Sequence, residues 1–141
     1  MRYLGLDLGS KTLGCAISDR SGIFARSYKI IRHNEEYNKL LTDVKEIVEQ
    51  EKIEAIVLGY PKNMDNSIGF KAQLSIEFKT KLEDTLKLPV YLQDERLTTK
   101  QAQDVLISND TSRKKRKKVI DSMAACIILQ SYLDKENKNG R

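Results

Sequence analysis

The strongest constraint in this sequence is an aspartate near the end of its first apolar segment. Residues 2–6 read Arg-Tyr-Leu-Gly-Leu, the pattern of a short, mostly apolar strand; Asp7 lies near its end, and Gly9 and Ser10 begin a turn. A carboxylate on such a strand is costly to bury unless a metal ion, a proton or hydrogen bonds compensate its charge. Asp7 has an ordinary interpretation as a turn cap or a solvated residue, but two more acidic residues occur in equally unusual settings: Glu95 just past an apolar strand, and Asp121 inside the most apolar predicted helix. We therefore expect the fold to bring Asp7, Glu95 and Asp121 together.

Hydrophobic periodicity predicts an α/β chain. Short turns separate apolar segments at 2–7, 12–18 and 23–31, which indicates an antiparallel meander. Helices are predicted over about 34–48 (with Asn34 as N-cap), 68–87, 98–108 and 119–134, and buried strands over 53–58 and 90–92. This order predicts a five-stranded mixed sheet, antiparallel at one edge, parallel in the middle and flanked by helices. It is the order of the ribonuclease H-like fold, and we expect one domain over residues 1–141 with 135–141 as a frayed tail.

The composition excludes several classes of protein. With 40% hydrophobic and 32% charged residues and no apolar run of 18, the chain is expected to be soluble and cytoplasmic, not membrane-bound. Its two cysteines, Cys15 and Cys126, are far apart and have apolar neighbours, so we expect reduced thiols and no zinc motif. His33 is the only histidine, which excludes a His-rich metal site and argues against a Ser-His-Asp triad. Acid–base chemistry must then come from carboxylates, lysines, tyrosines or a bound metal.

The basic character of the chain comes from one segment. Six consecutive basic residues occupy positions 113–118: Arg113, Lys114, Lys115, Arg116, Lys117 and Lys118. The net charge is +5, but the remaining 19 of the 25 Lys and Arg residues are balanced by 20 acidic ones. Such a run is often a solvated loop, and it is also the signature of contact with a phosphate backbone. We expect it to bind nucleic acid, together with Lys11 and Arg96.

The three carboxylates suggest a metal centre. Oxygen ligands without histidine or thiolate suit Mg²⁺ or Mn²⁺. Two such ions, about 3.5–4 Å apart, activate a water and stabilise the leaving oxygen of a phosphodiester. Asp94 competes with Glu95 for the second position, and because adjacent strand residues face opposite ways only one of them can point into the site. Asp19 and Asp65 are weaker candidates, because turns use aspartate routinely.

Five segments together resemble one family. They are residues 5–11, 18–19, 59–65, 94–99 and 120–130. In this order and at these distances they resemble the YqgF family of bacterial proteins, also called the Holliday-junction-resolvase-like or pre-16S rRNA nuclease family. The resemblance implies a cytoplasmic, magnesium-dependent nuclease that trims the 5′ end of the small-subunit ribosomal RNA precursor, with Asp7, Glu95 and Asp121 at the acidic positions. Asn66 stands where the family usually has glycine, which leaves the substrate contacts of that loop open.

Three functions compete at this stage. The first is a metal-dependent nuclease that acts on structured RNA, or on branched DNA as related family members are described to do. The second is a nucleic-acid-binding assembly factor with little catalysis, although a pure phosphate binder gains nothing from clustered carboxylates. The third is a sugar-kinase or chaperone-type ATPase, whose first phosphate loop resembles residues 7–10, but such proteins need two domains of this size. We favour the first, as a monomer or a weak homodimer.

Overall fold

The computed structural model describes the backbone of residues 1–9, 11–60, 70–94 and 113–140, and all their side chains except those at 70–72, 94, 113–122 and 138–140. Its elements are β1 (Tyr3–Leu8), β2 (Thr12–Ser18), β3 (Ala25–Arg32), α1 (Tyr37–Glu51), β4 (Ala55–Tyr60), α2 (Phe70–Leu86), β5 (Val90–Asp94) and α4 (Arg113–Gly140). The helix predicted over 98–108 and the loop with Asp65 and Asn66 lie outside the described residues. No helix in the described part is long and apolar enough to cross a membrane.

The five strands form one mixed sheet in the order β3-β2-β1-β4-β5. β2 is antiparallel to both β1 and β3, because tight connections join these strands. β4 is parallel to β1, and β5 is parallel to β4, because a helix returns the chain each time. This arrangement confirms the predicted antiparallel edge and parallel centre.

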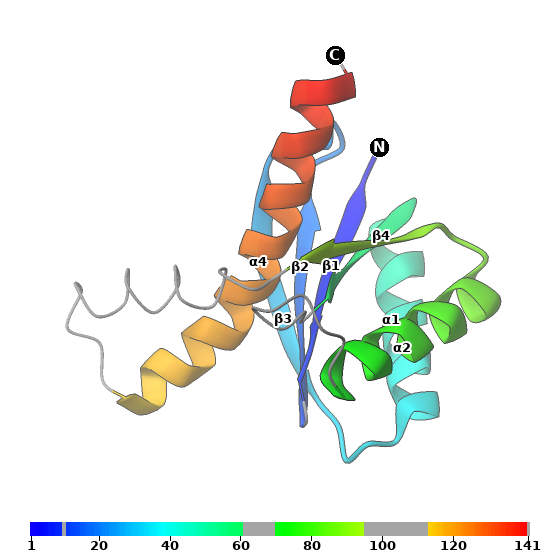
Figure 1. Ribbon diagram of the computed structural model, residues 1–141, viewed down its shortest axis with the longest axis vertical. Helices are drawn as coiled ribbons and strands as arrows, with labels where there is room; N and C mark the ends of the chain where they lie inside the picture. Colours follow the sequence, from blue (N-terminus) through cyan, green and yellow to red (C-terminus); the bar gives the residue numbers. More distant parts are fainter. Residues whose placement is uncertain (10, 61–69, 95–112, 141) are drawn as a thin grey trace.

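Of the helices that the structure describes, α1 and α2 cover one face of the sheet and α4 covers the other (Figure 1). Strand alternation divides the core accordingly. Leu4, Leu6 and Leu58 pack with α1 and α2. Ala16 and Val57 pack with residues of α4 instead. Because Asp7 follows Gly5 and Tyr3 at every second position of β1, it belongs to the α4 face.

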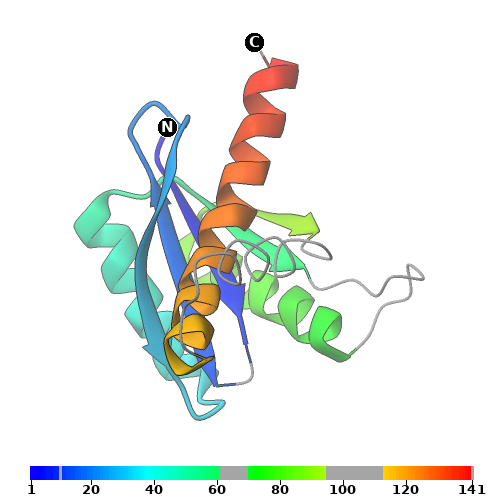
Figure 2. The same cartoon turned by 90° about the vertical axis from the view of Figure 1, so that its left-hand side faces the viewer.

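A close contact between β1 and α4 explains the glycine at residue 5. A Cβ atom there would lie 2.7 Å from the Leu129 Cβ and 3.1 Å from the Ala125 carbonyl oxygen. Only glycine permits so close an approach of strand and helix. The helix runs opposite to β1, so its N-terminal half lies toward the end of the sheet where β1 ends (Figures 1 and 2).

The structure corrects the predicted start of α1. The helix begins at Tyr37, its N-cap position is Glu36, and no side chain caps it. Asn34 is therefore not the N-cap. Glu35 has a left-handed φ of 64°, and its backbone N–H donates to His33 Nδ1, so the chain turns here before it becomes helical.

The structure also corrects the bounds of the last helix. α4 begins at Arg113 and ends at Gly140, so it includes the basic run and all but one of the residues expected to form a frayed tail. The apolar repeat, which predicts a helix over 119–134, is confined to the middle of this segment. Lysine, arginine and glutamate have high helix propensity, so the element continues at both ends without an apolar stripe.

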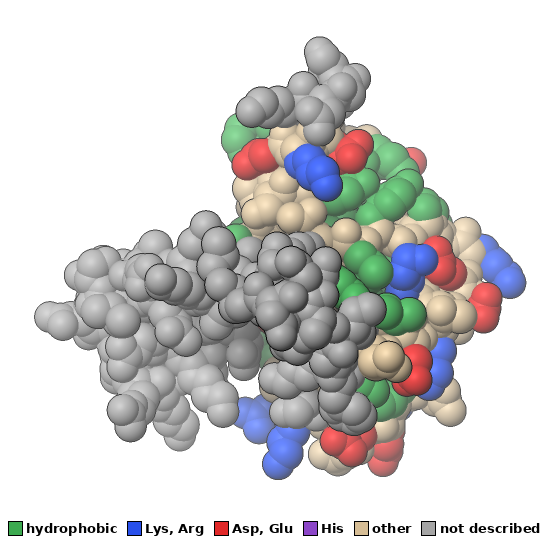
Figure 3. Space-filling model, in the orientation of Figure 1, with side chains coloured by type: hydrophobic (Ala, Val, Ile, Leu, Met, Phe, Trp, Pro, Cys, Tyr) green, Lys and Arg blue, Asp and Glu red, His purple; other side chains and the backbone are tan. Residues whose placement is uncertain are grey.

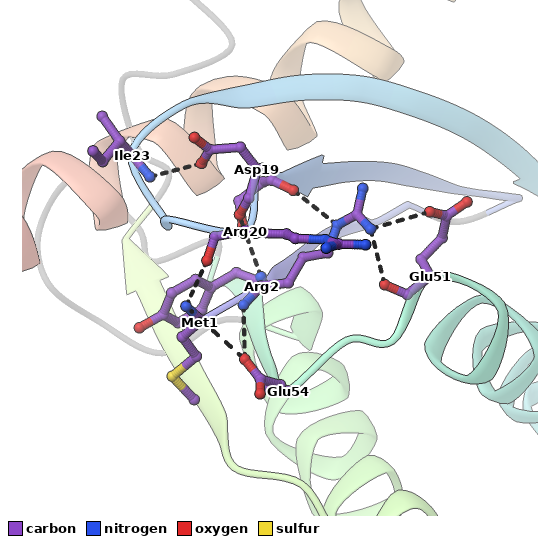
Figure 4. A network of polar contacts seen from close by, with 9 residues as sticks. Met1, Arg2, Asp19, Arg20, Ile23, Glu51 and Glu54 are labelled. Carbon is purple, nitrogen blue, oxygen red and sulfur yellow. Dashed lines mark hydrogen bonds and ion pairs between the residues drawn. The ribbon is translucent and has the colours of Figure 1, made fainter.

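A polar network holds the end of the sheet at which β1 begins (Figure 4). Arg2 Nε donates to the Ser18 carbonyl oxygen at 3.1 Å, and Arg2 Nη1 donates to the Glu51 carbonyl oxygen at 3.1 Å. The same guanidinium lies 3.6 Å from the Glu51 carboxylate. Arg2 thereby joins the start of β1 to the ends of β2 and α1. Asp7 lies at the opposite end of the sheet, away from this network.

Candidate active site

Asp7 lies on β1 one residue before the strand ends. It pairs with Gly14 of β2 and is partly buried. The neighbouring strand β4 is parallel to β1, so its carboxyl end lies at the same edge of the sheet. In open α/β sheets this edge is where ligands bind.

Residue 121 lies on the face of α4 that packs against β1. It is one turn before Ala125 and two turns before Leu129, the two residues that contact Gly5. One helical turn of four residues advances about 6 Å, and the two residues from Gly5 to Asp7 advance about 6.6 Å. Both steps lead from the Gly5 contact toward the end of β1 (Figure 1). Backbone positions 7 and 121 therefore both lie on the side of the Gly5 contact where β1 ends.

The sheet register bears on the choice between Asp94 and Glu95. Tyr91 stacks on Tyr132 of α4, with ring centroids 5.4 Å apart, so it belongs to the α4 face. Val90 and Leu92 pack with the α1 and α2 core. Position 94, which pairs with Tyr60, has the parity of Val90 and Leu92, and so differs from the parity of Asp7. Glu95 and Arg96 lie outside the described residues.

The predicted phosphate-binding residues occupy two places. Lys11 is exposed in the turn between β1 and β2, close in sequence to Asp7. Residues 113–118 form the first turns of α4, so the basic run is helical and not the loop that is one interpretation of such a run. On the face drawn in Figure 3, the described basic and acidic side chains are interspersed, and no large patch of either sign is visible.

The turn after Asp7 is tied to the chain that leads into α1. The Gly9 backbone N–H donates to the Thr12 carbonyl oxygen at 2.8 Å, which closes the turn. His33 Nε2 lies 3.0 Å from the Gly9 carbonyl oxygen, and the ring is buried. In the sequence, this histidine bears only on which kinds of site are excluded. Its position directly after an edge strand was the one signal that it contacts the turn.

The two cysteines are poor metal ligands or nucleophiles in this fold. Cys15 is buried on the α1 face, and burial raises the pKa of its thiol to about 12. Burial also raises the pKa of the Cys126 thiol, which donates to the Ala25 carbonyl oxygen at 3.5 Å. Both stay protonated near neutral pH, which agrees with the prediction of reduced thiols.

Asp19 is a turn residue at the other end of the sheet. Its carboxylate accepts hydrogen bonds from the Ser21 hydroxyl at 2.6 Å and from the Ile23 backbone N–H at 2.9 Å. These bonds, with the Ser21 hydroxyl first, lower the pKa of Asp19 to about 2. Its placement after β2 separates it from Asp7, so it does not belong to the candidate site.

A polar cavity of about 380 Å³ also lies at that other end. It is lined by Arg2, Arg20, Gln50, Glu51, Lys52 and Glu54. The guanidinium of Arg2 is already bound to two carbonyl oxygens and paired with Glu51. We therefore place the candidate site at the end of β1 that carries Asp7, the end toward which α4 also leads from the Gly5 contact to position 121.

The donor chemistry of this end favours a hard cation. Both ring nitrogens of His33 are engaged by backbone groups, and Cys15 faces the other side of the sheet. Among the described residues, no group of three metal-binding side chains lies together; Asp7 is the one predicted ligand whose side chain is described. Carboxylate oxygens without nitrogen or sulfur suit Mg²⁺ and Mn²⁺.

Comparisons with known proteins agree with this fold. The family model described as "RuvX: Holliday junction resolvase" matches residues 1–135. A Bacillus subtilis (strain 168) protein named "Putative pre-16S rRNA nuclease" is 51% identical over 138 residues, covering 97% of this chain and all of the relative. A Geobacillus sp. (strain WCH70) protein of the same name is 50% identical over 135 residues, covering 95% and 98%. The structure of Thermus thermophilus RuvC with a Holliday junction substrate matches 96% of this chain and 95% of its own, with a TM-score of 0.59 at 15% identity. This likeness confirms the predicted ribonuclease H-like fold.

Proposed function

We propose that this chain, which belongs to the RuvX family of Holliday junction resolvases, is a nuclease that hydrolyses phosphodiester bonds. This is the family that the sequence motifs resemble and that is also called YqgF. Relatives about half identical over nearly the whole chain carry a pre-16S rRNA nuclease name. We therefore favour processing of the 5′ end of the small-subunit ribosomal RNA precursor as the reaction, carried out in the cytoplasm by one domain. The observation that supports it best is that β1 and α4 touch at Gly5 and that positions 7 and 121 both lie on the same side of this contact.

Three carboxylates form the proposed centre. Asp7 comes from β1 and Asp121 from α4. We propose Glu95, not Asp94, as the third, because position 94 has the strand parity of the opposite face and an extended chain reverses parity at the next residue. Together they would hold Mg²⁺ or Mn²⁺, which supplies an activated water and stabilises the leaving oxygen.

The protein groups around the centre orient the substrate. His33 is not available as a general base, since its two nitrogens bind backbone groups. Lys11, Arg96 and the basic run Arg113–Lys118 provide contacts to phosphate without reading sequence. Because this run forms the start of the helix that carries Asp121, it draws the phosphate backbone toward the carboxylates.

A Holliday junction is the second candidate substrate. The family description names a resolvase, and RuvC, whose solved complex contains a Holliday junction, shares the fold. Four-way junctions have two-fold symmetry, so a resolvase should act as a dimer. We propose a monomer or a weak homodimer, which sedimentation at several protein concentrations would distinguish.

The test is a cleavage assay with two substrates. A 5′-extended ribosomal RNA precursor and a synthetic four-way DNA junction are each incubated with Mg²⁺ or Mn²⁺ and with wild type, Asp7→Asn or Asp19→Asn. The last variant makes the same change in a turn at the other end of the sheet. We expect metal-dependent RNA cleavage that Asp7→Asn abolishes and Asp19→Asn retains.

The other outcomes separate the alternatives. Cleavage of the junction alone would move the assignment to a resolvase. Metal-independent binding of either substrate without cleavage would favour an assembly factor. Cleavage by Asp7→Asn at the wild-type rate would refute the carboxylate centre.

A further inference from the structure

His33 joins the start of α1 to the turn after Asp7. The residue is only 8% exposed and directly follows β3. Its Nε2 lies 3.0 Å from the Gly9 carbonyl oxygen, and its Nδ1 lies 3.1 Å from the Glu35 backbone nitrogen. Its own backbone N–H donates to the Lys11 carbonyl oxygen at 2.9 Å. Backbone and side chain of one residue therefore hold two carbonyl groups of the same turn.

The hydrogen bonds determine the tautomer of the ring. A backbone N–H can only donate, so Nδ1 must accept from Glu35 and carries no proton. The ring is therefore neutral with its hydrogen on Nε2, which donates to the Gly9 carbonyl oxygen. The His33 ring also lies beside the Tyr37 ring, with centroids 5.8 Å apart, and the Tyr37 centroid lies 6.3 Å from that of Phe78 in the core.

The turn that His33 holds has two functional neighbours. Gly9 is two residues after Asp7, the proposed metal ligand, and the turn also contains Lys11, a proposed phosphate contact. The β1–β2 pairs fix the strand as far as Leu8, and beyond it the Gly9–Thr12 hydrogen bond and His33 hold the turn. The connection from β3 to α1 and this turn lie at the same end of the sheet in both views (Figures 1 and 2).

We propose that His33 is a positioning residue for the nuclease site: its Nε2–H holds the Gly9 carbonyl group and so fixes the turn between Asp7 and Lys11. The inference rests on the proposed function, because it assigns His33 a part in the same site. It also requires that His33 act through Gly9 and touch neither substrate nor metal. A histidine that served the core alone would affect cleavage only through the fraction of folded protein.

Two substitutions separate the two ring nitrogens. Glutamine extends about as far as Nε2 and can donate to the Gly9 carbonyl group, whereas asparagine extends about as far as Nδ1 and can accept only from Glu35. We expect His33→Gln to cleave within about threefold of wild type and His33→Asn to lose at least about tenfold, since a misplaced group can cost about 10²-fold. Both rates are measured at a temperature at which urea unfolding shows each variant to be folded.

A second readout does not depend on cleavage. Amide hydrogen exchange at Gly9, whose N–H donates to the Thr12 carbonyl oxygen, should accelerate in His33→Asn and stay near wild type in His33→Gln. Nitrogen-15 NMR of the wild-type ring should show the proton on Nε2. Equal cleavage by the two folded variants would overturn the positioning role. If wild type cleaves no substrate, the proposed function fails, and unchanged Gly9 exchange in His33→Asn would still show separately that His33 does not hold the turn.

Discussion

Replacement of Gly5 by alanine tests whether the contact between β1 and α4 sets the active site. The new Cβ would lie 2.7 Å from the Leu129 Cβ, whereas ordinary contacts begin at 3.4 Å, so the two elements must separate by about 0.7 Å. The Ala125 carbonyl oxygen, at 3.1 Å, limits movement to the other side. Neither neighbour is the end of a flexible side chain, so β1 and α4 themselves must shift. Overpacking of this kind costs about 1–3 kcal/mol.

The shift should reduce cleavage by more than the loss of stability explains. Positions 7 and 121 lie beyond the Gly5 contact in the same direction, one on the strand and the other on the helix, so separating β1 from α4 separates these two positions. A displacement of about 1 Å can cost about 10²-fold in rate. We therefore expect Gly5→Ala to cleave at about a tenth of the wild-type rate or less, at a temperature where urea unfolding shows that it is folded.

Ile47→Val is the matched control for this experiment. Ile47 is buried in α1 on the other face of the sheet, and its truncation costs about 0.5–1.5 kcal/mol without touching α4. We expect this variant to cleave at the wild-type rate once corrected for the folded fraction. If folded Gly5→Ala cleaves as well as Ile47→Val, the β1–α4 contact does not set the site and the reasoning is refuted.

Three further predictions concern the rest of α4 and the far turn. Positions 114, 117 and 118 share the helical face of position 121, and neutralising them should reduce the slope of log binding constant against log salt concentration by up to about 0.7–0.9 per lost phosphate contact. Neutralising 115 and 116 should reduce this slope less. Equal slopes for the two variants would argue against this face. Gln130→Ala should destabilise the fold by about 1–2 kcal/mol in urea unfolding, because its amide accepts from the Ala25 N–H and donates to the Ile23 carbonyl oxygen, both at 2.8 Å. Asp19→Ala should be destabilising near neutral pH and approach wild type as the pH falls from about 4 toward 2, because the folded-state pKa of Asp19 is about 2, below its ordinary 3.8; a gap in urea midpoints that stays constant would contradict this.

The strands were predictable because each is a short apolar segment bounded by turn or helix signals, alternating with polar or small residues in β2 and continuous in β4. The turn after Ser18 contains Asp19 and Gly22, and the structure has β2 end and β3 begin on either side of it. The parallel pairing of β4 followed from the helix before it, since a short turn cannot join parallel strands. Local patterns of this kind predict the topology of the sheet, and this topology determines the edge at which Asp7 lies.

Other features depend on contacts that no local pattern records. Adjacent carboxylates such as Asp94 and Glu95 are alike in sequence, and the parity of position 94 emerges only from its pairing with Tyr60. The requirement for glycine at residue 5 comes from a helix more than a hundred residues later in the chain. His33 reads as a polar residue before a helix, yet Gly9 lies 24 residues away and supplies the partner for its ring.

Because the basic run lies on α4, variants that weaken substrate binding and variants that impair catalysis should change different kinetic constants. A helix is rigid over a few turns, so a phosphate held near residues 114–118 lies within roughly 5–11 Å along the axis from position 121. Loss of this charge removes attraction that substrate and transition state share, and should therefore raise KM while kcat stays near its wild-type value. Gly5→Ala leaves the charge in place and moves the carboxylates, so it should lower kcat instead. If α4 performs both tasks, the two kinds of variant must differ in which kinetic constant they change, although one alters α4 itself and the other alters the strand packed against it.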